Sequence, residues 1–158
     1  MPTIKIITIV NAPIERCFDL ARSIDLHQYT STKNNEKAIA GTTKGLINVG
    51  ETVTWQATHF GITQKLTSKI TQMEIPFMFE DCMLKGTFKK IQHQHLFEVK
   101  KQQTIMTDVF LFESPLGILG RMFNKVVLTK YMKRFLEQRN QAIKLIAETE
   151  EWKKYLQA

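Results

Sequence analysis

The chain contains little cysteine, proline or glycine: two cysteines, four prolines and seven glycines among 158 residues. Cys17 and Cys82 are isolated, so they provide neither a disulfide framework nor a zinc site of their own. The sequence also has no internal repeat, low-complexity tract or interdomain linker. We therefore predict one domain over residues 1–158, long enough to enclose a substantial core.

Long apolar runs and cofactor motifs are absent as well. No apolar stretch approaches the roughly 20 residues that cross a bilayer. Residues 1–10 alternate, Lys5 interrupts them and no small-residue cleavage site follows, so we interpret them as a strand rather than a signal peptide. The sequence has no P-loop, dinucleotide glycine fingerprint or haem-attachment cysteines. We predict a cytoplasmic protein without a cofactor.

Acidic residues are outnumbered by basic ones, which gives a formal net charge of +7 and a sequence pI near 9.5. The basic excess is spread over expected turns and helix flanks, and no nucleic-acid-binding motif accompanies it, so we predict no nucleic-acid partner. Anionic lipid headgroups or acidic ligands could be attracted, and a solvated basic surface is the simpler alternative. The residues concerned are Lys85, Lys89, Lys90, Lys100, Lys101, Arg121, Lys125, Lys130, Lys133 and Arg134.

The sequence does contain a long block of short alternating segments. Residues 3–10 are alternating and β-branched, which is typical of a strand. A helix is expected next, capped by Asn11 or Ala12 with Pro13 in its first turn, and then a short helix capped by Ser23 or Asp25. A weak strand near residues 38–40 and five clearer strands follow, at 51–59, 62–73, 77–86, 93–101 and 104–112.

One long helical stripe ends the chain. Apolar residues recur three or four positions apart from Leu128 to Ile146, so they share one side of a helix. A broad apolar face needs a large partner surface, which the strands can supply as a curved, mostly antiparallel sheet. We predict an α+β fold in the order β-α-α-β6-α, with an apolar hollow between sheet and helix that suits a small molecule.

A short amphipathic run over residues 116–127 precedes this stripe, and the apolar phase slips between Val127 and Leu128, so we expect a bend there. Arg121 and Lys125 lie beside apolar neighbours in the run. They could contact an anionic membrane transiently while ligand is exchanged, or the run could be a solvated helix start.

The last two strands form a hairpin that carries candidate chemistry. A tight turn at Gln102-Gln103 would place Phe97 opposite Asp108 and His95 opposite Phe110. In this register His95 and Asp108 are diagonal neighbours on one mixed face. The opposite face is more polar, so we expect the mixed face to point toward the long helix.

Several motifs are distributed along the chain from Ile4 to about Ile146. They are Ala12-Pro13-x-Glu15-x-x-Phe18-Asp19-Leu20-x-x-Ser23-Ile24-Asp25-x-His27, Gly50-x-x-Val53-x-Trp55, Gly86-x-Phe88, His93-x-His95-x-Phe97, Asp108-x-Phe110, Pro115-x-Gly117-x-x-Gly120 and Arg139. The first resembles the opening of the START-like, Bet v 1-like helix-grip (SRPBCC) superfamily. The others are similar to its bacterial polyketide cyclase/dehydrase-like branch.

This resemblance implies a seven-stranded antiparallel sheet that grips the C-terminal helix and leaves a ligand cavity between them. One motif departs from the pattern, because similar sequences tend to have Gly-Pro-Phe where this chain has Gly86-Thr87-Phe88. The rigidity of that loop is therefore left open. Members of the superfamily carry lipids, hormones and polyketides and some are enzymes, so the resemblance does not assign a reaction.

We predict that the cavity binds a small hydrophobic or amphipathic ligand, a lipid or polyketide-like compound, which the protein could also transport. His95, Asp108 and Arg139 would orient its head group. Aromatic and methionine side chains would enclose its apolar part, although each could instead belong to an ordinary core. These are Trp55, Phe77, Phe79, Phe97, Met106, Phe110, Phe112, Met122 and Phe135.

Other functions remain open. In an enzyme, His95 held by Asp108 would act as a base in cyclisation or dehydration of a bulky substrate, with Arg139 binding an oxyanion; Arg139 could equally neutralise Asp108 inside the fold. His93-x-His95 could share a metal with Asp108, but two firm ligands are too few, and we predict no metal site. The basic side of the sheet could dock an acidic protein. The oligomeric state is left open.

Overall fold

The computed structural model describes residues 2–114, 117, 122 and 127–156. The elements follow one another in the order predicted, with short 3-10 helices (η) and a short α-helix after the long C-terminal one added. They are β1 (Thr3–Val10), α1 (Ile14–Ala21), α2 (Ile24–Thr30), η1 (Thr32–Asn34), β2 (Lys37–Gly41), β3 (Thr52–His59), β4 (Ile62–Glu74), β5 (Met78–Lys85), β6 (Lys90–Lys100), β7 (Gln103–Glu113), α4 (Thr129–Ala147), η3 (Glu150–Trp152) and α5 (Lys153–Leu156).

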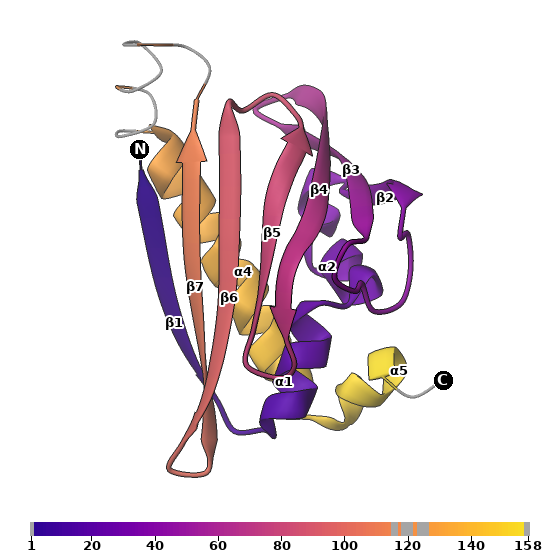
Figure 1. Cartoon of the computed structure of the whole chain (residues 1–158), viewed down its shortest axis with the longest axis vertical. Coiled ribbons are helices and arrows are strands. Elements are labelled where there is room, and N and C mark those ends of the chain that lie inside the picture. Colours follow the sequence, from indigo (N-terminus) through magenta and orange to yellow (C-terminus); the bar gives the residue numbers. More distant parts are fainter. Residues whose placement is uncertain (1, 115–116, 118–121, 123–126, 157–158) are drawn as a thin grey trace.

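The strands of the described residues form one sheet of seven, in the order β1-β7-β6-β5-β4-β3-β2. Every neighbouring pair is antiparallel. The sheet curves around α4, which crosses its inner face, while α1 and α2 lie over one part of that face (Figure 1). The predicted α+β fold, a curved antiparallel sheet gripping a C-terminal helix, is confirmed.

Alternation explains which side of each strand faces the helix. Along β1, the side chains of Ile4, Ile6, Thr8 and Val10 are buried, whereas the residues that alternate with them are exposed. β7 repeats this pattern, with every second residue from Thr104 to Phe112 buried. Period-two patterning therefore gives the sheet one inner, largely apolar face.

The two early helices begin as their local sequence dictates, with one correction. Ser23 caps α2, because its hydroxyl accepts a hydrogen bond from the Leu26 amide at 3.2 Å. The N-cap of α1 is Pro13, without a side-chain cap, so the expected capping by Asn11 or Ala12 is wrong. Asn11 Oδ1 instead accepts a hydrogen bond from the side-chain Nε2 of Gln103 at 2.6 Å.

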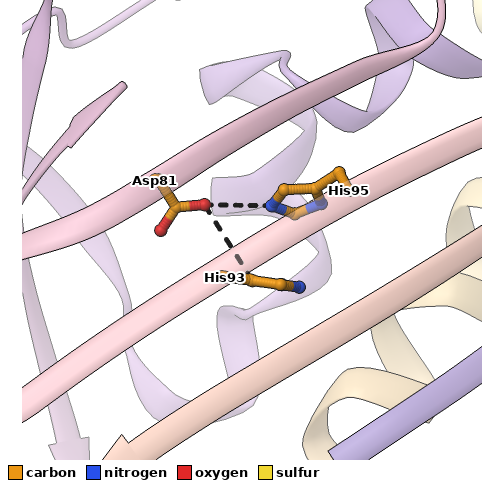
Figure 2. A group of neighbouring side chains, drawn as sticks. All are labelled: Asp81, His93 and His95. Atoms are coloured by element: carbon orange, nitrogen blue, oxygen red, sulfur yellow. Dashed lines mark hydrogen bonds and ion pairs between the residues drawn. The ribbon is translucent and has the colours of Figure 1, made fainter. Parts of the chain in front are cut away.

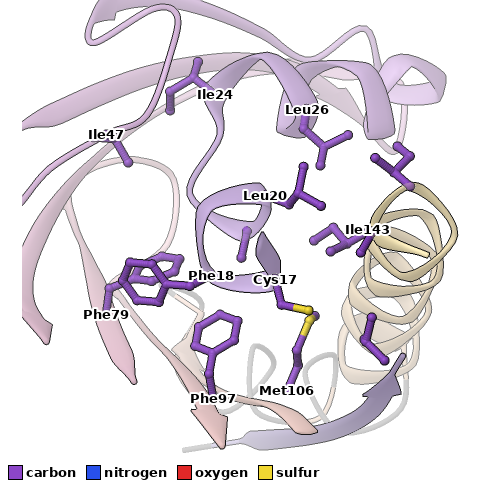
Figure 3. Close-up of a cluster of buried hydrophobic side chains, with 14 of the residues drawn as sticks. Cys17, Phe18, Leu20, Ile24, Leu26, Ile47, Phe79, Phe97, Met106 and Ile143 are labelled. Carbon is purple, nitrogen blue, oxygen red and sulfur yellow. The ribbon is translucent and has the colours of Figure 1, made fainter. Parts of the chain in front are cut away.

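The apolar core of the described residues comprises two clusters. The first surrounds Phe18 of α1, whose ring makes edge contacts with Phe79 at 5.5 Å and Phe97 at 5.3 Å between centroids (Figure 3). The second contains Phe112 and Leu136 and joins β1, β6 and β7 to α4. Together they fix the sheet against the helices around the cavity described below.

The β6–β7 hairpin differs in register from the prediction. Its turn is Lys101-Gln102, and both residues have positive φ, 52° and 64°. Such left-handed pairs usually contain Asn, Asp or Gly, so no local sequence signal marks this turn. The shift of two residues keeps the same side chains on the inner face, and it places His95 directly opposite Asp108.

The segment before α4 is described only in part. Most of the amphipathic run 116–127 lies outside the described residues, as do Arg121 and Lys125. Val127 and Leu128 form a wide π-type turn leading into α4, at the place where the apolar phase slips. Within the described ranges, no helix combines the length and apolarity needed to cross a membrane.

Candidate functional site

A cavity of about 450 Å³ lies between the inner face of the sheet and α4. Its wall is mostly apolar, with side chains from β3, β4, β5, β7 and α4 that include Trp55, Ile70, Phe79, Phe110 and Phe135. Ligand pockets in proteins commonly measure about 300–1,000 Å³ and are lined by apolar and aromatic groups with a few polar ones. In size and chemistry this cavity can accommodate a small organic molecule.

The residues predicted to line the cavity fall into three groups. Trp55, Phe79, His95, Phe110, Phe135 and Arg139 lie on its wall. Phe97 and Met106 belong to the core cluster around Phe18, and Phe112 is fully buried in the second cluster. Asp108 lies behind the histidines, as described below.

The other two predicted lining residues, Phe77 and Met122, are largely exposed rather than on the wall. Phe77 is 52% exposed, because it belongs to the turn that precedes β5 rather than to the alternating strand. Its amide donates to the Glu74 carbonyl at 2.6 Å. Met122 is 64% exposed, so its side chain lies toward solvent.

Four ionisable side chains, Asp81, His93, His95 and Asp108, form a His–Asp cluster at the cavity wall. They come from three adjacent strands: Asp81 lies opposite His93 across β5 and β6, and His95 lies opposite Asp108 across β6 and β7. Both histidines and Asp108 are buried, at 4%, 4% and 5% exposure. The strands therefore bring together two acids and two imidazoles in apolar surroundings.

The two imidazoles lie between the two carboxylates. His93 Nε2 donates to Asp108 Oδ1 at 2.8 Å, and His95 Nδ1 lies 3.3 Å from the same oxygen. On the other side, His95 Nε2 donates to Asp81 Oδ2 at 2.9 Å, and His93 Nδ1 lies 3.9 Å from that oxygen (Figure 2). An ionised carboxylate can only accept, so each imidazole is the donor in these bonds.

The helix contributes to this cluster through Asn140. Its Nδ2 donates to Asp108 Oδ2 at 2.5 Å, which gives the second oxygen of the buried carboxylate a partner. The expected pairing of Arg139 with Asp108 is not formed, because the Arg139 Nη2 donates to the Ala21 carbonyl at 3.1 Å. The neutral amide, rather than the guanidinium, therefore holds Asp108 against α4.

The charge state of the cluster follows from its contacts. Burial by itself would raise the pKa of Asp108, but hydrogen bonds from His93 and His95 hold that pKa well below its ordinary value. The pKa of Asp81 is lowered in the same way, against burial, by His95 and His93. The cluster therefore keeps both carboxylates ionised.

The two histidines respond in opposite directions. Burial would lower the pKa of His95, but its contacts with Asp108 and Asp81 raise that pKa overall. Burial and the neighbouring charge of His95 lower the pKa of His93. Two stacked imidazoles, with ring centroids 3.8 Å apart, thus favour one imidazolium and one neutral ring.

No known protein-family profile matches the chain, and the curated proteins contain no significant relative. Solved structures do match it. TTHA0849 from Thermus thermophilus aligns with a TM-score of 0.72 at 14% identity, over 94% of this chain and 100% of that chain. A START superfamily protein from Mycobacterium smegmatis aligns with a TM-score of 0.69 at 12% identity, over 92% of this chain and 97% of that chain. Ginseng major latex-like protein 151 from Panax ginseng aligns with a TM-score of 0.69 at 15% identity, over 94% of this chain and 98% of that chain.

The chain has the helix-grip fold of the START and Bet v 1-like proteins. The predicted resemblance is confirmed at the level of the fold, because these alignments extend over nearly all of each chain. Identities of 12–15% show the fold alone. What this helix-grip protein does must therefore be argued from its own cavity.

Asp81 is the residue of the cluster that sequence reasoning missed. It alternates with Phe79 and Met83 along β5, so it occupies an inward position between apolar neighbours. An acidic residue at an inward position was the available signal. Its place in the cluster depends on the pairing of β5 with β6, which sets Asp81 opposite His93.

Further polar groups lie elsewhere on the helix-grip cavity wall. His27 contacts Glu36 through Nε2 and stacks on Trp55 with centroids 4.3 Å apart. His59 Nδ1 is hydrogen-bonded to the Tyr131 hydroxyl at 2.6 Å. These groups were also missed, because their partners come from segments distant in sequence.

Arg139 is a buried cationic group of the wall. The residue is only 8% exposed, and its Nε is buried with no hydrogen-bond partner among the described residues. It lies close enough to Glu36 and Asp81 to help lower the pKa of each carboxyl. A buried guanidinium with a free N–H can donate to an oxygen of a bound molecule.

Proposed function

We propose that the protein binds a small hydrophobic or amphipathic molecule, a lipid or a polyketide-like compound, in the cavity between sheet and α4. The observation that carries the proposal is the cavity itself, about 450 Å³ in volume with a mostly apolar wall and a few charged groups. A solidly packed core would instead have filled this space, since protein interiors normally leave few voids larger than a water molecule. Binding would bury an apolar ligand away from water.

The distribution of side chains suggests how such a molecule would lie. Its apolar body would contact Trp55, Phe110 and Phe135, whose rings are all on the wall. An oxygen-bearing end would accept a hydrogen bond from Arg139, whose Nε has no partner among the described residues. The resemblance to START-like and Bet v 1-like proteins implies the same kind of cavity and supports this proposal. Transport would require exchange of the ligand with a membrane or a partner.

Mass spectrometry of molecules extracted from the purified native protein tests the proposal directly. We expect one dominant amphipathic compound, and competition between it and the fluorescent probe anilinonaphthalene sulfonate. Ala57 lies on the cavity wall, so Ala57→Phe should fill part of the space and weaken probe binding about tenfold or more. Ile9→Phe is the matched control, because Ile9 is 48% exposed on the outer face of β1. Equal binding by both variants would remove the cavity from consideration.

A second candidate function is proton transfer to a bulky hydrophobic substrate, as in a cyclase or dehydratase. His95 favours it, since this imidazole contacts a carboxylate at each ring nitrogen, at 2.9 Å and 3.3 Å. These contacts favour the protonated ring, so His95 would act as a proton donor rather than as the base expected from the sequence. His95→Gln that still binds the extracted compound but no longer converts it would support catalysis. Equal conversion by this variant would exclude it.

A further inference from the structure

Three metal-ligating side chains converge on one point of the cavity wall. One ligand atom of each of Asp81, His93 and His95 lies within 4.8 Å of the other two (Figure 2). Around a first-row metal with bonds near 2.0–2.2 Å, neighbouring ligand atoms are roughly 2.9–3.4 Å apart. Asp81 Oδ2 is 2.9 Å from His95 Nε2 and 3.9 Å from His93 Nδ1, so the two separations fall at and just above this spacing.

We propose that Asp81, His93 and His95 bind a divalent transition-metal cation at the wall of the cavity. Two imidazole nitrogens and one carboxylate oxygen are a donor set suited to zinc, iron(II) and related ions rather than to magnesium or calcium. Three protein ligands leave coordination positions open. All three residues line the cavity, so the open positions face the space that a ligand would fill.

Asp108 provides the outer support that such a site needs. Metal-bound histidines almost always donate the N–H of their other ring nitrogen to a carboxylate, carbonyl or water. Asp108 Oδ1 lies 2.8 Å from His93 Nε2 and 3.3 Å from His95 Nδ1, which leaves the two nitrogens nearest Asp81 to bind the ion. Asn140 holds the other oxygen of Asp108 at 2.5 Å. The hydrogen-bonding support of both imidazoles is therefore already assembled and fixed to α4.

The cluster also has the right charge for a cation. Its two carboxylates face two stacked imidazoles, and the ring planes are only 34° apart at a centroid distance of 3.8 Å. A metal ion would replace the proton that His95 Nε2 now donates to Asp81, and the Asp81 carboxylate would become a ligand. The site does not rest on the proposed ligand binding, because its three ligand atoms all come from the protein itself.

Metal titration of the full-length, tag-free protein tests the proposal after chelator treatment and dialysis. We expect Zn²⁺ and Co²⁺ to bind saturably at one ion per chain by calorimetry, and Mg²⁺ not to bind. X-ray absorption of the wild-type zinc complex should show two imidazoles and oxygen, without sulfur. This readout requires no substitution, so it decides the ligand set even where a variant misfolds.

Substitutions then assign the ligands. His93→Gln and His95→Gln should each weaken Zn²⁺ binding about 100-fold or more, and Asp108→Asn should weaken it about 10- to 100-fold. His27→Gln and His59→Gln are matched controls, since these two histidines also line the cavity and should leave the affinity within about threefold. Circular dichroism of each variant reports its folding.

Three results would overturn the site. They are the lack of saturable binding at one ion per chain, an unchanged affinity in both His93→Gln and His95→Gln, and a sulfur ligand in the absorption spectrum. Probe binding by the same metal-free preparations separates this outcome from failure of the ligand-binding proposal. A protein that binds anilinonaphthalene sulfonate but no metal retains its cavity and loses only the metal site.

Discussion

His95 on β6 lies directly opposite Asp108 on β7, and the carboxylate of Asp108 also accepts a hydrogen bond from His93 at 2.8 Å. One buried carboxylate thus joins two imidazoles of β6, and Asn140 ties it to α4. This places a charged group at the contact between sheet and helix, where most of the neighbours are apolar. The consequences for stability can be measured.

Asp108→Asn should destabilise the fold by about 3–5 kcal/mol, because it removes the buried negative charge that faces two imidazoles and replaces one carboxylate oxygen with an amide donor. Urea denaturation followed by circular dichroism measures the change. Asp19→Asn is the control. Its partner Arg22 lies one helical turn away at 2.9 Å with the Asp19 side chain 32% exposed, so its loss should cost no more than about 1 kcal/mol. Equal effects of the two substitutions would contradict a structural role for Asp108.

Phe18→Leu should cost about 1–2 kcal/mol, because Phe18 is fully buried and its ring is in edge contact with two other aromatic rings. Phe77→Leu should change the free energy of unfolding by less than about 0.5 kcal/mol, since the side chain is 52% exposed. Urea denaturation of the two variants compares them. The pair also tests the exposed position of Phe77. A large effect of Phe77→Leu would mean that this side chain is part of the interior.

Acidification should destabilise the protein partly through His27 and Glu36. Burial, together with the charge of Arg139, lowers the pKa of His27 in the folded state, so the unfolded chain binds the proton more readily. Burial alone would raise the pKa of Glu36, but the contact with His27 lowers it overall. For both groups, stability is present at higher pH and is lost as the pH falls.

The His27 contribution begins to disappear as the pH falls below its ordinary pKa of 6.5, and the Glu36 contribution disappears below 4.5, through the folded-state pKa. Thermal melts between pH 8 and 4 should therefore show Tm falling toward acid. His27→Gln should flatten the part of this slope between about pH 6.5 and 5. A slope that His27→Gln leaves unchanged would assign the acid sensitivity to other groups.

The two thiols should differ in reactivity. Burial raises the pKa of Cys17 to about 11, and the side chain is fully buried. Burial also raises the pKa of Cys82, but this residue is partly exposed on β5. We expect Ellman's reagent to modify Cys82 slowly in the folded protein and Cys17 only after unfolding. In Cys82→Ser, rapid modification of a thiol without denaturant would show that the α1 core opens readily.

The β6–β7 turn can be improved. Lys101 and Gln102 both adopt positive φ, a conformation that Asn and Gly accept with less strain. Lys101→Asn combined with Gln102→Gly should raise the free energy of unfolding by about 0.5–1 kcal/mol. Lys100→Gly, one residue earlier in the strand, should lower it instead. Destabilisation by the double substitution would contradict the turn position.

The sequence predicted the fold well because its signals are local. Alternation in residues 3–10 and the three-to-four spacing from Leu128 to Ile146 each fix which side of an element is apolar. Asp81, by contrast, joins the cluster through the pairing of β5 with β6, and Asn140 joins it through the position of α4 on the sheet. Both contacts depend on how distant segments meet, so the partners of Asp81 and Asn140 cannot be read from their own elements.

The β6–β7 hairpin shows how the backbone conformation of two turn residues changes the contacts within the candidate site. Two residues without a typical turn signature, Lys101 and Gln102, adopt left-handed conformations and shift the register by two positions. The buried face survives this shift because side chains alternate with a period of two. The shift does change which residues face each other across the strands. His95 and Asp108, predicted to be diagonal neighbours, are therefore directly opposite each other.

Two consecutive residues near the middle of α4 hold different parts of the fold: Arg139 bonds the Ala21 carbonyl of α1, and Asn140 bonds Asp108 of the sheet. Beyond them, Lys144 contacts the Ile9 carbonyl, so the C-terminal half of the helix is tethered as well. The N-terminal half is held by polar contacts of the Tyr131 side chain, whose hydroxyl contacts His59 and Asn34. We therefore expect a bulky occupant to displace this half of α4 before the other, so that the Tyr131 end of the helix limits the size of molecule that the cavity accepts.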